Sequence, residues 1–327
     1  MKTNLKMKPA EKHAANILVI LGIIALIAIA VFIFQGLNTN NFDFNFPRRL
    51  RKIAAILLVS TCIGYSSVVF QTITENRILT PNVMGLDSLY MFIQSLIVYM
   101  FGAKQLMLMN STVHFIISVG LMMAASLVIY SLVFRTEGQN IYTLVLAGMI
   151  MGTFFRGISS FLQMMIDPNE FSILQGKMFA TFSNVNEKLL TISCFTVLVC
   201  LLISRKDIAK MDVLVLGKDS AISLGISYNK TMLRTMIIIS VMVSVSTVLV
   251  GPVTFLGILL VSISRELMKT YRHIYLIFCA ILTGLIALPL GQLVSERIFN
   301  GKTTLSVILN FVGGIYFIYL LLKESKQ

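Results

Sequence analysis

The chain has 327 residues, of which 57% are hydrophobic and only 13% are charged, and its mean hydropathy is +0.86. A soluble protein of this length carries about 25% charged residues. The apolar residues come in runs of roughly 18–22, long enough to cross a hydrocarbon core as helices. The composition excludes a soluble enzyme and predicts an all-α polytopic membrane protein, with residues 1–327 forming one domain.

The formal net charge of +13 would suit a nucleic-acid-binding protein if the basic residues formed one patch. They lie instead between the apolar runs, as membrane topology requires, so we expect lipid and no nucleic acid as a partner. The four cysteines and three histidines are too scattered to predict a disulfide or a metal site. These residues are Cys62, Cys194, Cys200, Cys279, His13, His114 and His273.

In chain order, ten segments are predicted to span the membrane. The third, sixth and eighth are short, and the first is too long for the apolar region of a signal peptide. An even number of spans places both termini on one side, which we expect to be the cytoplasm because 17 of the 27 Lys and Arg residues then lie inside. The ranges are 17–35, 52–70, 87–101, 112–134, 141–163, 189–203, 232–250, 253–268, 273–291 and 303–322.

Two regions between spans stand out. Four cations, Arg48, Arg49, Arg51 and Lys52, crowd the start of the second span on the expected outer side, where positive charge is disfavoured. They could meet lipid headgroups or an acidic partner. The expected cytoplasmic loop 204–230 mixes apolar and charged residues in a way that predicts a short amphipathic helix pair. The outer loop 164–190 could hold a short surface helix.

No catalytic residues are predicted. The segment Gly301-Lys302-Thr303-Thr304 resembles the end of a phosphate-binding loop, but Glu296 stands where the motif needs its first glycine. We therefore expect no ATP site and no enzymatic activity. No Asp or Glu is expected in the middle of a span, and Asp87 is expected at the edge of the third. That pattern argues against an ion-coupled secondary transporter.

Arg156 is the cation that lies furthest from the ends of a predicted span. A cation inside a membrane helix is unfavourable by about 2.5–3.5 kcal/mol, so it either contacts an anionic substrate in a water-filled pathway or extends to the interface. Gly148 and Gly152 on the same span form a small-xxx-small pair, which favours close helix packing.

Three segments in order resemble the FecCD-type permeases, which import ferric siderophores, heme and vitamin B12. They are Gly64…Gln71…Asn76-Arg-Ile-Leu-Thr-Pro81…Gly85, Leu216-Gly217…Ala221…Leu224-Gly225, and Gly251-Pro-Val-Thr-Phe-Leu-Gly257 through Arg265. The resemblance implies one permease of a two-subunit pore in a bacterial cytoplasmic membrane. Its expected partners are two cytosolic ATPases, which bind the ATP, and an external substrate-binding protein, so this chain needs no cofactor.

The resemblance also implies roles for particular residues. Arg49, Lys52 and Arg297 would meet carboxylates of the binding protein. Asn76 and Ile78 would form the cytoplasmic gate. We also expect Gln71, which belongs to the same motif, and Arg156, because of its place within a span, along the substrate pathway. The ATPases would bury a coupling segment at 213–226, through residues Leu214, Leu216, Gly217, Ala221, Leu224 and Gly225.

The sequence departs from the family pattern at Ser262-Ile-Ser-Arg265, where the family commonly has P-H-I-A-R, and in lacking tryptophan. The run from Arg265 to His273 resembles the branch that handles catechol-type siderophores. In that branch the second permease is commonly a paralogue, so we expect a heterodimer that imports a ferric siderophore. Import of heme or vitamin B12 is the alternative.

Overall fold

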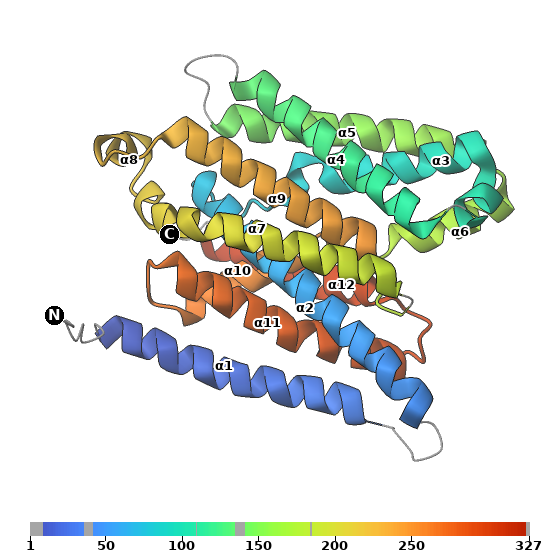
Figure 1. The fold of residues 1–327 in the computed structure, drawn as a ribbon, viewed down its shortest axis with the longest axis horizontal. Helices are drawn as coiled ribbons and strands as arrows, with labels where there is room; N and C mark the ends of the chain where they lie inside the picture. The colour runs from blue at the N-terminus through green and yellow to red at the C-terminus, as the bar shows by residue number, and fades with distance from the viewer. Residues whose placement is uncertain (1–8, 36–41, 109, 135–140, 184, 325–327) are drawn as a thin grey trace.

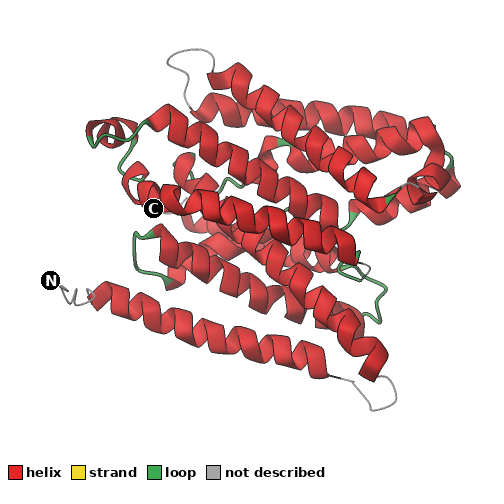
Figure 2. Ribbon diagram, viewed as in Figure 1, coloured by secondary structure: helices red, strands yellow, loops and turns green. Residues whose placement is uncertain are grey.

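The computed structural model describes residues 9–35, 42–108, 110–134, 141–183 and 185–324, and every regular element within these ranges is helical (Figures 1 and 2). The long helices run roughly side by side along the longest axis of the molecule. The elements are α1 (Pro9–Phe34), α2 (Phe42–Ile73), the 3₁₀ turn η2 (Pro81–Met84), α3 (Leu86–Leu108), α4 (Ser111–Phe134), α5 (Ile141–Met165), α6 (Pro168–Met178), α7 (Glu187–Leu214), α8 (Lys218–Ser223), α9 (Tyr228–Val250), α10 (Leu256–Leu267), α11 (His273–Leu293), the π-helical turn η3 (Val294–Ile298) and α12 (Leu305–Glu324).

The all-α membrane architecture is confirmed. In the described ranges, eight helices are long and apolar enough to cross a membrane, and the shorter Leu86–Gly102 segment of α3 is apolar as well. Each of the ten predicted ranges falls on one helix. Helix α10 is short, at 12 residues, and α3 is interrupted by a kink at Gly102. Ten spans and cytoplasmic termini stay predictions. The start of α1, the end of α12 and α8 share one end of the bundle, hereafter the α8 end, and α6 lies at the opposite end (Figure 1).

Helix α2 forms the centre of the bundle. It packs against α11, α9, α7 and α10, whereas α1 lies at the periphery against α11. Small residues allow these close contacts. A Cβ added to Gly64 would lie 3.2 Å from the backbone of Ile281 on α11, and Ser60 packs equally closely on Gly284. Buried small residues at helix crossings are typical of membrane bundles, where packing replaces the hydrophobic effect.

The prediction of a short sixth span is wrong. Helix α7 continues to Leu214 because its polar face is tied to the neighbouring helix α9. The buried carboxylate of Asp207 accepts from Lys210 Nζ at 2.8 Å and lies 3.1 Å from Arg234 Nε on α9. Half of the expected loop at 204–230 is therefore the end of a helix. The expected surface helix in the loop 164–190 is confirmed as α6, which Asp167 caps through the amide of Asn169.

Candidate functional site

The connection between α2 and α3 turns back into the bundle from the α8 end. Asn76 Oδ1 accepts a hydrogen bond from the amide of Ile78 at 2.9 Å, a side-chain-to-backbone turn that fixes the start of this loop. Asn82 Nδ2 donates to the carbonyl of Val253 at 3.1 Å, which ties the loop to the segment before α10. We call residues 74–85 the gate loop. Asn76 shapes this loop, whereas Ile78 lines the two cavities described below.

The gate loop ends against the middle of α5. A Cβ on Gly85, whose φ is +78°, would lie only 2.5 Å from the Cα of Gly152, and a Cβ on Gly148 would lie 2.8 Å from the Cα of Met84. The small-xxx-small pair of α5 therefore accommodates the backbone of the gate loop. Because of this contact, α3 begins level with the middle of α5 rather than at the end of the bundle.

A cavity of about 420 Å³ lies between the gate loop, α5, α10 and α12. Arg156 lines it, in agreement with the pathway interpretation of this cation, and we call it the Arg156 cavity. Its lining residues are Ile78, Leu79, Thr80, Asn82, Gly85, Ser88, Met149, Gly152, Thr153, Arg156, Thr254, Phe255, Ile258 and Phe317.

Asp87 lies beside this cavity, in the first turn of α3 and so at the edge of the third span, as expected. That helix begins inside the bundle, however, because Gly85, two residues before Asp87, packs against Gly152 in the middle of α5. The hydroxyl of Thr254 donates to Asp87 Oδ2 at 3.4 Å, and Oδ1 is buried without a partner among the described residues. A carboxylate therefore does lie well inside the bundle, and the sequence argument against ion coupling loses that support.

A second cavity of about 240 Å³ lies nearer the α8 end, and we call it the Arg265 cavity. Ile78 lines both cavities, so the two adjoin at this side chain. Helix α10 lines the first through Phe255 and Ile258 and the second through Ser262 and Arg265, which follow one another on one helix face. The two cavities thus lie in sequence along α10, as a route through the bundle would.

Gln71 is not among the lining residues of these two cavities. Its side chain is 2% exposed within the core of α2, and neither of its amide atoms finds a partner among the described residues. Only its backbone carbonyl reaches the gate loop, where it accepts from the amide of Asn76 at 3.2 Å. The expectation that Gln71 lies along the pathway stays a prediction, and in this conformation its side chain is buried in the core.

The expected coupling segment at 213–226 forms a compact turn around α8. Gly217 and Gly225 flank this short helix with φ values of +91° and +83°, a conformation that side-chain-bearing residues avoid. Leu214 and Ala221 are 3% and 0% exposed, so the chain's own fold buries two side chains that were expected to meet a partner. The amphipathic helix pair is confirmed only in part, as the end of α7 and α8.

The other apolar side chains of this segment point outward. Leu216 is 62% exposed and Leu224 64%, and Val215 and Ile222 are exposed beside them. Four outward-facing apolar residues at the polar end of a membrane bundle form a candidate surface for another protein. We call these four residues the α8 patch.

His273, at the start of α11, joins this end of the bundle to the gate loop. Its Nδ1 lies 2.6 Å from Asp212 Oδ1, and its backbone amide donates to the same oxygen at 2.8 Å. Its Nε2 lies 2.8 Å from the hydroxyl of Thr72, two residues before the gate loop begins. Asp212 directly precedes the coupling segment, so one imidazole connects that segment with the gate loop.

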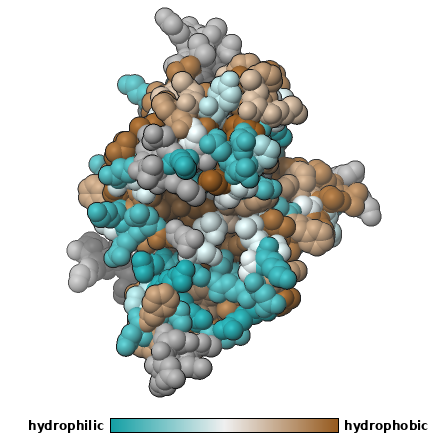
Figure 3. Space-filling view, turned by 90° about the vertical axis from the view of Figure 1, so that its right-hand side faces the viewer, coloured by the Kyte–Doolittle hydropathy of each residue, from teal (hydrophilic) through white to brown (hydrophobic). Residues whose placement is uncertain are grey.

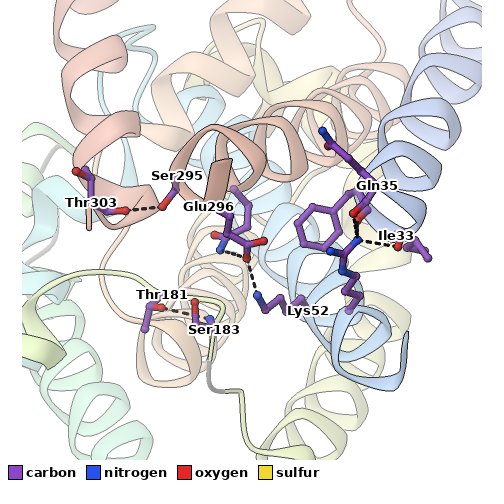
Figure 4. A network of polar contacts seen from close by, with 11 residues as sticks. Ile33, Gln35, Lys52, Thr181, Ser183, Ser295, Glu296 and Thr303 are labelled. Carbon is purple, nitrogen blue, oxygen red and sulfur yellow. Dashed lines mark hydrogen bonds and ion pairs between the residues drawn. The ribbon is translucent and has the colours of Figure 1, made fainter. Parts of the chain in front are cut away.

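At the α6 end, all three cations expected to dock a partner are engaged within the chain. Arg49 Nη1 donates to three carbonyl oxygens at the end of α1, at 2.7–2.9 Å, and so caps that helix. Lys52 pairs with Glu296 at 2.6 Å, and Gln292 also donates to that carboxylate (Figure 4). Arg297 donates to the carbonyl of Gln35 at 3.2 Å.

Arg48 and Arg51 remain exposed at the same end. Arg51 has only a 3.8 Å pair with the exposed Glu187, and Arg48 lies over the ring of Phe44. Together with Lys52 they border a depression of about 290 Å³ lined also by Phe182, Ser183, Val185 and Asn186. Polar side chains gather on this face of the molecule, seen end-on in Figure 3. Arg48 and Arg51 therefore carry exposed positive charge at this end, as do the exposed Lys188 and Lys302.

A polytopic helical bundle with two cavities in sequence along one helix, and an exposed apolar patch at one end, has the architecture of a membrane permease subunit. The chain belongs to the FecCD transport family, whose model it matches over residues 15–323. It is 49% identical over 304 residues to the petrobactin import system permease protein YclO of Bacillus subtilis, covering 93% of this chain and 96% of that protein.

Two further comparisons agree. The chain is 31% identical over 277 residues to the petrobactin import system permease protein FatC of Bacillus anthracis, covering 85% of this chain and 78% of that protein. A metal-chelate type ABC transporter solved in an inward-facing conformation superposes with a TM-score of 0.82 at 21% identity, covering 95% and 99% of the two chains, and so shares the fold. The chain is therefore a transport subunit of the bacterial cytoplasmic membrane rather than an enzyme.

Proposed function

We propose that the chain is a permease subunit of an ABC importer that brings a ferric catechol-type siderophore, of the petrobactin class, into the cell. The observation that carries the proposal is the 49% identity to a petrobactin import permease over nearly the whole of both chains. The Arg156 cavity supports it, because a cation lining a route through the membrane suits an anionic chelate.

Energy would come from two ATPases bound at the α8 end. The α8 patch offers them exposed Val215, Leu216, Ile222 and Leu224, and Leu214 and Ala221 hold the segment to the bundle from within. ATP would bind to those partners, and this chain would need no cofactor. A displacement of the segment would reach the gate loop through Asp212, His273 and Thr72, since hydrogen bonds of 2.6–2.8 Å link the three side chains.

An external binding protein would dock at the α6 end. Arg48 and Arg51 are exposed cations that border a depression there, and they would meet its carboxylates. Arg49, Lys52 and Arg297 would support this surface indirectly, because they join α1, α2 and η3 (Figure 4).

A second permease would pack against α5 and α12, and we expect it to be a paralogue. Gly157 on α5 and Gly314 on α12 have nothing within 4 Å of an added Cβ, so both offer space for a neighbouring helix. Both helices border the Arg156 cavity, through Arg156 and Phe317. A second subunit on these helices would enclose the cavities between the two chains.

Uptake by cells tests the proposed substrate. A strain that lacks this chain should fail to accumulate ⁵⁵Fe supplied as iron(III) petrobactin, and the gene supplied in trans should restore accumulation. Excess unlabelled iron(III) petrobactin should compete, whereas heme and vitamin B12 should not. If only heme or vitamin B12 competed, that compound and not a siderophore would be the substrate.

A further inference from the structure

The Arg265 cavity carries more positive charge than the chain itself neutralises. Arg77, Arg265 and Lys323 line it, against a single carboxylate from Glu266. Lys323 Nζ already pairs with Glu266 at 3.1 Å. The two guanidinium groups therefore have no carboxylate partner among the described residues, although Arg77 lies close enough to Arg265 to repel it.

Arg265 also holds an unused donor. Its Nε is buried and makes no hydrogen bond within the described part of the chain. An unpaired guanidinium N–H shielded from water is unfavourable by about 1–3 kcal/mol or more. Because this part of the guanidinium group is poorly solvated, an anion that enters the cavity beside the group would stabilise its positive charge.

The remaining lining suits an organic anion rather than a small inorganic one. Ser262 and Tyr316 contribute hydroxyl groups, and Ile78 and Leu320 contribute apolar surface. A guanidinium group presents paired N–H donors that match the two oxygens of a carboxylate or of a catecholate. A ligand with an apolar body and several acidic oxygens would satisfy both parts of the lining.

The position of the Arg265 cavity indicates which ligand binds there. It follows the Arg156 cavity along α10 and shares the apolar side chain of Ile78 with it, so the two cavities adjoin. A site for a lipid headgroup is not expected in line with a transport route. The transported chelate would pass both cavities.

We propose that the Arg265 cavity is a second, exit-side binding site for the anionic ferric chelate, in which Arg77 and Arg265 bind its acidic oxygens after it has passed Ile78. This inference rests on the proposed function, because it takes the transported solute to be a ferric siderophore. Two cationic sites that adjoin at an apolar residue would hold the chelate in turn, so that it is released in two steps.

Binding from the α8 side tests the site. Inside-out membrane vesicles that contain the complete importer receive iron(III) petrobactin labelled with ⁵⁵Fe, without binding protein. We expect saturable binding that weakens as salt is added. Arg265→Gln and Arg77→Gln should each weaken it about tenfold, as expected for the loss of one charge-assisted contact. Arg265→Lys, which keeps the charge, should retain most of the affinity and also shows that the position tolerates substitution.

Lys269→Gln is the matched control, because Lys269 is an exposed cation four residues from Arg265 that does not line the cavity. Equal binding by wild type, Arg265→Gln, Arg77→Gln and Lys269→Gln would overturn the exit site. Loss of phosphatidylglycerol binding in Arg265→Gln, with chelate binding unchanged, would overturn it in favour of a lipid site. Absence of uptake by the wild-type importer would instead contradict the proposed function.

Discussion

His273 Nδ1 lies 2.6 Å from Asp212 Oδ1, a contact that binds the end of α7 to the start of α11. The same imidazole reaches the hydroxyl of Thr72 at the end of α2. Asp212 precedes the segment that carries the α8 patch, and Thr72 precedes the gate loop. Three helices that end at the α8 end are therefore connected through one side chain.

Breaking this connection should separate ATP hydrolysis from transport. His273→Ala and Asp212→Asn each remove charge-assisted or buried hydrogen bonds worth about 1.5–3 kcal/mol. We expect uptake per ATP hydrolysed to fall about tenfold in the reconstituted importer, while the ATPases remain bound. Asp219→Asn is the control, since Asp219 is exposed on α8 and its side chain makes no contact of this kind. Unchanged uptake per ATP in both variants would exclude the connection as the path of coupling.

The exposed and buried leucines of the coupling segment should behave differently. Leu216→Asp and Leu224→Asp place charge on the α8 patch and should abolish co-purification of the ATPases, with the thermal stability of the permease unchanged. Leu214→Ala creates a cavity inside the fold and should lower stability by about 2–5 kcal/mol. Thermal denaturation in detergent and affinity purification separate the two effects. Normal ATPase binding by Leu216→Asp would show that the α8 patch is not part of the interface with the ATPases.

Docking of the binding protein should depend on the exposed outer cations. The double variant Arg48→Glu, Arg51→Glu should weaken its affinity for the importer in nanodiscs severalfold at low salt, with a smaller difference at high salt. Arg49→Gln should instead loosen α1, because Arg49 caps that helix, and should lower the melting temperature. If Arg49→Gln alone weakened docking and the double variant did not, the original assignment from family resemblance would be correct.

Substitutions at two of the glycines of α5 should separate the folding of this chain from its pairing with the second permease. Gly152→Leu would drive a side chain into the backbone of Gly85 and should prevent folding of the single chain. Gly157→Leu meets nothing within this chain and should leave it folded, while lowering co-purification of the second permease. Intact pairing in Gly157→Leu would move that interface away from this face of α5.

The membrane helices could be predicted from the sequence because apolar run length has one structural solution in a bilayer. The end of α7 could not, since its extension past residue 203 depends on Asp207 meeting Arg234, which is distant in sequence. The depth of Asp87 was missed for a similar reason. A turn that re-enters the bundle looks like an ordinary loop until Gly85 is seen against Gly152.

The site was predictable only where residue type determines exposure. Arg156 in an apolar run had to face water or a partner, and it lines a cavity. The outer cations were found as a group, but charge alone could not separate Arg49, which caps α1, from Arg48, which is exposed. His273 gave no sequence signal, because its partners Asp212 and Thr72 lie 61 and 201 residues away.

Transport by the purified importer tests the central claim most directly. The chain, its paralogous permease and the ATPases would be reconstituted in proteoliposomes with the binding protein, and accumulation of iron(III) [⁵⁵Fe] petrobactin measured with ATP or with an ion gradient. The account predicts accumulation that requires ATP and all of these subunits. Accumulation by this chain alone, driven by an ion gradient without ATP, would contradict it.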